Sequence, residues 1–282
     1  MADSNGYELL DSRGGEKLER FGDRLLARPS TLSVWMRRRP DLWRQAAAIH
    51  QHQRGWRFPG ERVGPWVCSP VPGLRMNLEL TDSGQIGLFP EHASYLDECT
   101  RWVAEIARQG RKARVLNLFA YTGLATLACA KAGGDVTHVD VAKHCLDWTT
   151  ANLRLNQREG VRFIRDDAVK YLDRLGKQGQ TFDLVIADPP TFSRLDRNHA
   201  WTLEEILPDL VRMLVRVAAT PGRIILTSHL QQSSPQITAN LFRDLAPGAS
   251  VTVRDLSLPE SGTDRILPCG NYNLVELAAA KP

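Results

Sequence analysis

The segment Asp188-Pro189-Pro190-Thr191-Phe192 follows the apolar run 182–187 and could act directly on a substrate. Proline has no backbone N–H and stiffens the chain, so this segment presents mainly acceptors, namely its carbonyl groups and the Asp188 carboxylate. Such acceptors could bind the exocyclic amino group of a nucleobase or orient a ring nitrogen, while Phe192 stacks on the base. We therefore predict a catalytic group of Asp188, Pro189, Pro190 and Phe192. The simpler alternative is an ordinary Pro-Pro turn.

A glycine turn follows another apolar run, at 115–119, and leads into a helical segment. In open α/β sheets, ligands bind beyond the carboxyl ends of the strands, and a glycine there lets a ligand approach the backbone closely. The GxGxxG pattern is absent, so a dinucleotide is poorly supported. A tight strand–helix turn is the alternative. We predict cofactor contacts from these residues: Asn117, Phe119, Ala120, Tyr121, Thr122 and Gly123.

Two aspartates end the next two apolar runs. Asp140 lies about twenty residues after the glycine turn, where a carboxylate can accept hydrogen bonds from both hydroxyls of a ribose. Asp167 could accept from an adenine amino group, while the amide of Ala168 meets a ring nitrogen. Val141, which follows Asp140, belongs to the same predicted cofactor-binding set. Either aspartate could instead cap the helix that follows it.

Regular alternation of strand and helix patterns begins near residue 114. Apolar runs typical of buried strands are separated by amphipathic segments, which predicts a parallel sheet covered on both faces. Two final strand candidates have no helix between them and must be antiparallel if they pair. The predicted strands are 115–119, 136–139, 161–164, 184–187, 224–226, 251–256 and 274–277, and the helices are 124–131, 144–156, 168–175, 203–218 and 235–245.

The first part of the chain is rich in turns and poorly periodic. Short alternating runs such as 74–80 lie between Gly- and Pro-containing turns, which indicates strands. One helix is expected at 38–51 and another at 95–109. We therefore expect two domains: a small, mainly β attachment over residues 1–105 with possible RNA binding, and an α/β domain over residues 106–282.

Arginines and tryptophans alternate in one stretch of the attachment. Guanidinium groups neutralise phosphates and aromatic rings stack on bases, so this composition favours nucleic-acid binding. The alternative is that the tryptophans form the core of a small domain and the arginines its solvated face. The residues that we predict to bind the substrate are Arg37, Arg38, Arg39, Arg54 and Arg57.

The overall composition sets a few limits. No apolar run among the 282 residues approaches the ~18 needed to span a bilayer. The first residues do not resemble a secretory signal. The five cysteines are scattered, without a CxxC pair or zinc-ligand spacing. We expect a cytoplasmic protein that has no metal site and does not bind membranes. The net charge of +4 is too small to identify a partner.

These motifs together resemble bacterial class I methyltransferases that modify bases of 23S ribosomal RNA. The similarity rests on 117–123, Asp140, Asp167-Ala168 and 188–193, and 87–92 also looks like a loop of those enzymes. It extends over nearly the whole chain. The resemblance implies a Rossmann-like methyltransferase sheet, closed by an antiparallel C-terminal hairpin, with S-adenosylmethionine as the cofactor. The implied cofactor contacts are Phe119, Tyr121, Gly123, Asp140, Asp167 and Asp188.

Two departures from that family affect the predicted chemistry. The attachment does not clearly show the RNA-binding domain that members often carry. Members that methylate cytosine C5 have a cysteine after the fifth strand, where this chain has Thr227-Ser228-His229. Cys269 is the one other cysteine expected at the cofactor edge. We therefore predict methylation of a base nitrogen of RNA, with ribosomal RNA as the partner.

Two other functions stay open at this point. One is methylation of a small molecule or a protein through the same site. The other is a nucleic-acid-binding protein without activity that has kept the cofactor fold, against which the intact Asp188-Pro-Pro segment argues. The sequence does not indicate an oligomeric state.

Overall fold

The computed structural model describes residues 5–194, 200–230 and 234–278. The chain divides into two compact units. The N-terminal unit comprises Met1–Ala93, Ala151–Gln157 and Ser257–Cys269, and the C-terminal unit comprises Ser94–Thr150, Arg158–Leu256 and Gly270–Pro282. Among the described residues, no helix combines the length and the apolar character needed to cross a membrane.

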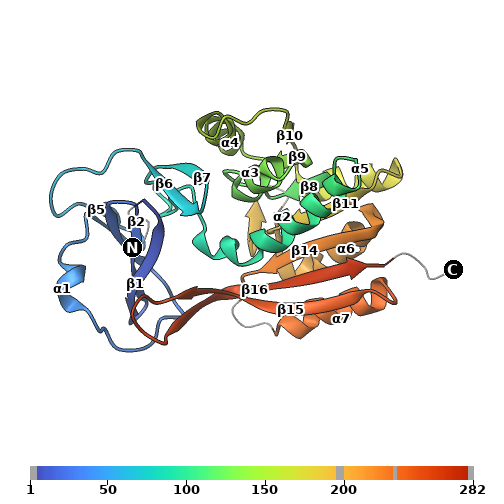
Figure 1. The fold of residues 1–282 in the computed structure, drawn as a ribbon. Helices are drawn as coiled ribbons and strands as arrows, with labels where there is room; N and C mark the ends of the chain where they lie inside the picture. Colours follow the sequence, from blue (N-terminus) through green and yellow to red (C-terminus); the bar gives the residue numbers. More distant parts are fainter. Residues whose placement is uncertain (1–4, 195–199, 231–233, 279–282) are drawn as a thin grey trace. The chain divides into compact units, whose positions relative to one another are not determined.

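A seven-stranded sheet forms the centre of the C-terminal unit, with the order β10-β9-β8-β11-β14-β16-β15 (Figure 1). The first five strands in this order are parallel, and β16 pairs antiparallel with β14. This confirms the predicted parallel sheet closed by a C-terminal hairpin. The strands are Arg114–Leu118 (β8), Asp135–Asp140 (β9), Arg162–Arg165 (β10), Phe182–Ala187 (β11), Ala218–Ser228 (β14), Ser250–Pro259 (β15) and Ile266–Leu277 (β16).

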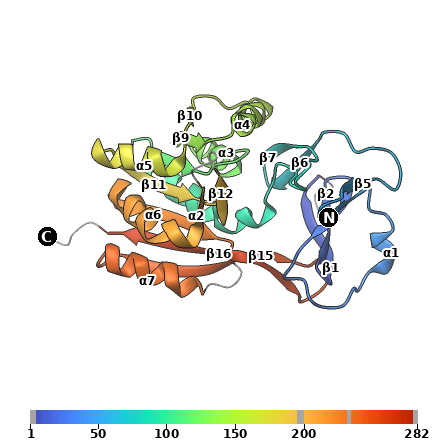
Figure 2. The same cartoon turned by 180° about the vertical axis from the view of Figure 1, so that it is seen from behind.

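Helices cover both faces of this sheet (Figures 1 and 2). On one face, α5, α6 and α7 pack against alternate strand residues such as Leu116, Val185 and Ile224. On the other face lie α2, α3 and α4, and the rings of Tyr95 in α2 and Tyr272 in β16 meet edge to face. The helices are Ala93–Arg108 (α2), Leu124–Lys131 (α3), Lys143–Leu155 (α4), Ala168–Lys177 (α5), Leu203–Val217 (α6) and Pro235–Leu245 (α7).

Strand register brings the chemically interesting segments to one edge of the sheet. Leu118 at the end of β8 pairs with Val139 in β9 and with Ala187 at the end of β11. Arg165 at the end of β10 pairs with Asp140. The turns that follow these strands therefore emerge side by side, as expected for the ligand-binding edge of a parallel sheet.

The N-terminal unit is mainly β, as predicted. Strands β1 to β5 form one sheet in sequence order, and β6 and β7 form a separate antiparallel ribbon. A small hairpin of β12 and β13 belongs to the C-terminal unit. The bounds are Tyr7–Arg13 (β1), Glu16–Phe21 (β2), Arg24–Pro29 (β3), Ala48–Gln51 (β4), Gly55–Arg57 (β5), Trp66–Val71 (β6), Leu74–Leu78 (β7), Phe192–Arg194 (β12), Ala200–Thr202 (β13), Pro40–Trp43 (α1) and Pro90–His92 (a 3₁₀ turn).

The helix predicted at 38–51 is wrong in most of its length. Helix α1 covers Pro40–Trp43 alone, and Ala48–Gln51 forms β4 instead. Ala48 is fully buried where it pairs with Leu26 of β3, so tertiary pairing in the sheet overrides the local helical preference.

The tryptophans of the Arg/Trp stretch are structural. Trp43 is buried in the cluster of Leu10, Leu18 and Ala27, and its indole N–H donates to Asp11. The other three indole N–H groups also have protein acceptors: Trp35 donates to Ser12 Oγ, Trp56 to the Thr81 carbonyl and Trp66 to the Phe21 carbonyl. These four rings therefore belong to the fold of the N-terminal unit.

A buried ion pair joins β2 to β3 in the N-terminal unit. The fully buried carboxylate of Glu19 accepts two hydrogen bonds from the Arg28 guanidinium, at 2.7 and 3.0 Å, and Lys17 Nζ lies 3.1 Å away. Burial opposes the charged form of Glu19, but Arg28 and Lys17 outweigh that effect and lower the pKa of its carboxyl.

Replacing Arg28 with methionine should destabilise the protein, because it leaves a buried carboxylate without its main partner. We expect the free energy of unfolding to fall by about 3 kcal/mol at neutral pH. Since the folded pKa of Glu19 is depressed, this pair stabilises above the unfolded pKa and loses its effect as the pH falls through the folded pKa. Urea unfolding at neutral pH and at a pH below the folded pKa of Glu19 measures the loss of stability, with the exposed Arg24→Met as the control. Equal losses in the two variants would contradict the prediction.

Candidate cofactor and substrate site

The turn between β8 and α3 has an unusual backbone. Phe119, Tyr121 and Gly123 have φ angles of 53°, 49° and 86°. Such left-handed conformations strain non-glycine residues and occur most often at functional sites. A Cβ atom on Gly123 would lie 2.4 Å from Cγ2 of Thr149, so glycine is required there. The packing of Thr149 against Gly123 therefore fixes the backbone of this turn.

Asp140, at the end of β9, ties this turn to the neighbouring strand. Its Oδ2 accepts from the amide of Tyr121 and its Oδ1 from the amide of Ala142, both at 2.9 Å. A carboxylate has about four acceptor positions, so two amides do not exhaust it. Burial raises the pKa of Asp140, although the two amides act in the opposite direction. Asp140 can thus hold the turn and accept further donors.

The ends of β9 and β10 offer an apolar surface beside polar groups. Val141 is 50% exposed, which is unusual for a valine beside a buried sheet. Asp167 caps α5, because its Oδ1 accepts from the amide of Lys170 at 2.9 Å. Ala168 is the first residue of α5, so its N–H has no carbonyl within the helix to bond. The capping alternative for Asp167 therefore holds, and its second carboxylate oxygen is not used by the cap.

A buried polar network lies beneath the glycine turn, and no sequence pattern predicts it. Asn117, 3% exposed, donates to Thr126 Oγ1, which lies 2.9 Å from His138 Nδ1. On the other side of the ring, Thr149 Oγ1 lies 3.5 Å from His138 Nε2 and donates to the Tyr121 carbonyl at 3.1 Å. Burial lowers the pKa of His138 to about 3, so the imidazole is neutral.

Three predicted residues thus support the turn from below. Asn117 points into this network, and Thr122 is almost fully buried. Ala120 is buried as well, and its amide donates to the Val139 carbonyl at 3.1 Å. The more accessible residues of the turn are Phe119 and Tyr121, whereas Gly123 is buried.

Asp188 follows β11 and contacts the next strand through its carboxylate. Its Oδ1 accepts a hydrogen bond from the hydroxyl of Thr227 and lies 3.1 Å from His229 Nε2. Its amide lies 3.5 Å from the Leu118 carbonyl of β8. The side chain of Asp188 is 16% exposed, so it is held firmly and still reaches solvent. From the sequence, residues 227–229 were of interest only because they lack the cysteine of members that methylate cytosine C5. Their contact with Asp188 was not predicted.

Aromatic side chains surround the segment after Asp188. Pro189 is buried and Pro190 exposed, and Phe192 in β12 is 53% exposed. The ring of Trp201 in β13 meets that of Phe119 edge to face, with centroids 6.2 Å apart. Trp201 could not be predicted from the sequence, because one tryptophan in an amphipathic segment gives no periodic signal.

The five predicted arginines of the N-terminal unit differ in how their side chains are used. Arg37 stacks on Trp43 with its guanidinium carbon 4.8 Å from the ring centroid, and Arg39 donates to the Ser261 carbonyl at 2.5 Å. Arg38, Arg54 and Arg57 are exposed. These three are the side chains of the set that reach solvent most freely.

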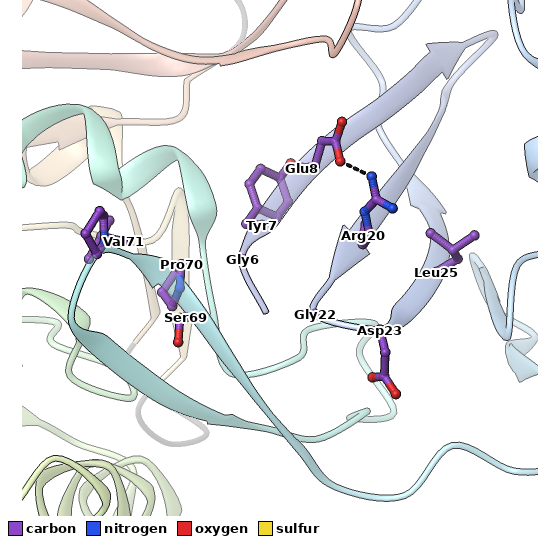
Figure 3. Close-up of a pocket in the computed structure, with 11 residues that line it drawn as sticks. Gly6, Tyr7, Glu8, Arg20, Gly22, Asp23, Leu25, Ser69, Pro70 and Val71 are labelled. Atoms are coloured by element: carbon purple, nitrogen blue, oxygen red, sulfur yellow. Dashed lines mark hydrogen bonds and ion pairs between the residues drawn. The ribbon is translucent and has the colours of Figure 1, made fainter. Parts of the chain in front are cut away.

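A cleft of about 760 Å³ lies in the N-terminal unit, between the start of β1 and the β6–β7 turn (Figure 3). Tyr7, Pro70 and Val71 line it together with the ion pair of Glu8 and Arg20. None of the predicted catalytic or cofactor-binding residues lines this cleft.

The strand order, the antiparallel closing hairpin and the edge formed by the glycine turn, Asp140 and Asp188 define a Rossmann-like methyltransferase. A family model described as S-adenosylmethionine-dependent methyltransferase matches residues 45–233, which is more than half of the chain. The chain therefore belongs to this family, and S-adenosylmethionine is its methyl donor.

Solved and curated relatives agree with this family. The chain is 32% identical to an S-adenosylmethionine-dependent methyltransferase from Agrobacterium tumefaciens, whose structure matches with a TM-score of 0.89 over 96% of this chain and 90% of that one. It is 39% identical over 158 residues to the ribosomal RNA large subunit methyltransferase K/L of Syntrophotalea carbinolica, covering 54% of this chain and 20% of that protein. The matched segment therefore spans about a fifth of this curated relative.

Replacing Asp140 with alanine should weaken S-adenosylmethionine binding by about 1.5–3 kcal/mol, the usual loss for hydrogen bonds to a charged acceptor. Because burial raises the pKa of Asp140, wild-type affinity should also fall with acid at a higher pH than for an ordinary aspartate. Titration calorimetry measures both effects, and Asp173→Ala, which removes an exposed ion pair with Lys177, is the matched control. Unchanged affinity in Asp140→Ala would rule out a role for Asp140 in binding the cofactor.

Proposed function

We propose that this protein transfers a methyl group from S-adenosylmethionine to a nitrogen of an RNA base, with ribosomal RNA in the cytoplasm as the substrate. The observation that carries the proposal is the Asp188-Pro189-Pro190 segment at the sheet edge that also bears the glycine turn and Asp140. The similarity to methyltransferases named for large-subunit ribosomal RNA supports the choice of RNA.

We assign the cofactor to the strand ends. Asp140 accepts from the ribose hydroxyls, and the exposed side chain of Val141 packs against the adenine. Asp167 and the Ala168 amide bind the polar edge of that ring. Phe119, Tyr121 and Gly123 face the remainder of the molecule. The residues fit this group because Asp140 keeps acceptor capacity and Val141 offers an apolar surface.

The chain contributes to the reaction mainly by holding the base in place. The bound cofactor supplies an activated methyl group. The Asp188 carboxylate and the Pro189 carbonyl accept from an exocyclic amine, or fix the plane of the base so that a ring nitrogen faces the methyl group. Thr227 and His229 fix the Asp188 carboxylate. Phe192 stacks on the base. A ring nitrogen has a free lone pair, so positioning alone provides much of the rate. An exocyclic amine must also release a proton as its nitrogen takes the methyl group, and the Asp188 carboxylate is placed to accept that proton.

The cysteines support transfer to nitrogen and argue against transfer to pyrimidine C5, which needs a thiolate that adds to C6. Cys68, Cys99, Cys129 and Cys145 are buried. Cys269 is partly exposed, but burial raises the pKa of its thiol to about 12, so little thiolate forms at neutral pH.

Asp188→Ala should slow methyl transfer to RNA by at least about a hundredfold, while the affinity for S-adenosylmethionine changes little. Interactions made mainly in the transition state appear in kcat, and losing a positioned polar group at the reacting centre has about this effect. Single-turnover transfer of a tritiated methyl group to unmodified large-subunit RNA measures the rate. Asp188→Asn keeps one oxygen acceptor, so its rate of methyl transfer should lie between those of wild type and Asp188→Ala. A wild-type rate in Asp188→Ala would contradict the proposed role.

RNA with 5-fluorocytidine in place of cytidine distinguishes the two kinds of chemistry. An enzyme that adds a thiolate to C6 becomes trapped on this base, whereas transfer to nitrogen leaves no covalent complex. We expect no complex that survives denaturing electrophoresis. A stable complex that disappears in Cys269→Ala would show that C5 is the target.

A further inference from the structure

Three large apolar side chains of the N-terminal unit are exposed to solvent. Val34 is 80% exposed, Met36 82% and Ile266 60%. Val34 and Met36 lie in the loop before α1, and Ile266 begins β16 at the tip of the β15–β16 hairpin. The Arg265 side chain donates to the Met36 carbonyl at 3.0 Å, so the loop and the tip are in contact. We call these three side chains, together with Arg37, Arg38, Arg39 and Arg265, the 34–39/266 surface.

The exposure of these side chains does not come from a loose loop. Between Val34 and Met36, Trp35 packs against Leu9, Leu258 and Leu267, and its indole donates to Ser12 Oγ at 3.1 Å. The Trp35 carbonyl also accepts from the Gly14 amide.

The far end of the loop is held in the same way. The Asp11 carboxylate accepts from the amides of Arg38 and Arg39, at distances between 3.0 and 3.3 Å. The hairpin tip is joined to β1 through a bridge between Leu9 and Glu260, and the two lie side by side in Figure 1. The apolar side chains are therefore presented on a rigid backbone, which lowers the entropy cost of binding.

The charged groups around this surface are mainly positive. Arg38 is exposed, and Arg265 lies over the Trp35 ring. Arg39 reaches the Ser261 carbonyl. Of the acidic groups on the hairpin tip, Glu260 is buried, bonded to Ser12 Oγ and paired with Arg265 at 3.6 Å, and Asp264 is exposed. The positive charge that is left for a partner therefore comes mainly from Arg38. A surface that combines exposed apolar side chains with arginines suits a polyanion that also has flat apolar groups.

We propose that the 34–39/266 surface binds an unpaired segment of the RNA substrate, with Val34, Met36 and Ile266 against bases and Arg38 on a phosphate. This inference rests on the proposed function, since it takes RNA as the substrate. Methionine and isoleucine serve as wedges against unstacked bases in nucleic-acid-binding proteins, and guanidinium groups neutralise the backbone beside them. A second copy of the chain would place arginines against arginines across a two-fold axis, which disfavours that occupant.

The experiment measures binding of a labelled single-stranded RNA, and of the duplex with its complement, by fluorescence anisotropy over a range of salt concentrations. The apolar variant is Met36→Ser with Ile266→Ser, and its control is Ile237→Ser, which removes a 49% exposed isoleucine from α7. The charge variant is Arg38→Gln, and its control is the exposed Arg162→Gln at the start of β10. Circular dichroism and the urea unfolding midpoint of each variant show that both units are folded.

Wild type should prefer the single strand. The apolar variant should lose about five- to tenfold in affinity for it, as partial burial of two such side chains implies, without a change in salt dependence. Arg38→Gln should flatten the slope of log affinity against log salt by about one. Both controls should behave as wild type.

Single-strand affinity that both variants leave unchanged would overturn the proposal. So would a change of oligomeric state in the apolar variant, seen by light scattering, with RNA binding intact. The proposed function is tested separately, because methyl transfer by wild type can succeed or fail whichever surface guides the RNA.

Discussion

The Asp140 carboxylate connects the two strand ends on which the cofactor site depends. It holds the Tyr121 amide after β8 and the Ala142 amide after β9, across neighbouring parallel strands. This link helps to hold the left-handed conformations of Phe119 and Tyr121, which cost free energy in an isolated chain. The same carboxylate has acceptor capacity left for a ligand, so one side chain both shapes the turn and contributes to the proposed binding.

The polar network under the turn supports it from the other side. Thr149 fills the space that a side chain on residue 123 would need, and its hydroxyl holds the Tyr121 carbonyl. Asn117, Thr126 and His138 satisfy one another in the core, where an unpaired polar group would be costly. The neutral imidazole can donate at one nitrogen and accept at the other, which a charged ring could not do.

Much of the C-terminal unit could be predicted because its signals are local. Continuous apolar runs mark strands buried on both faces. Asp140 ends one such strand, Asp188 directly follows another, and Gly123 lies in the turn after a third. Three other features could not be predicted, because each depends on residues that are distant along the chain. Residues 48–51 became a strand because β3 was available to pair with them. Trp43 is in the core because Asp11 accepts its N–H. The roles of His138 and Thr149 arise from packing between β9, α3 and α4, which leaves no pattern in the sequence.

We propose that this protein methylates a base nitrogen of ribosomal RNA. Mass spectrometry of nucleosides from the ribosomal RNA of a deletion strain tests it most directly, with the wild-type gene and the Asp188→Ala gene returned in parallel. We expect that one N-methylated nucleoside is lost on deletion, restored by the wild-type gene and not by the variant. An unchanged set of methylated nucleosides, or the loss of a C5-methylated pyrimidine, would contradict it.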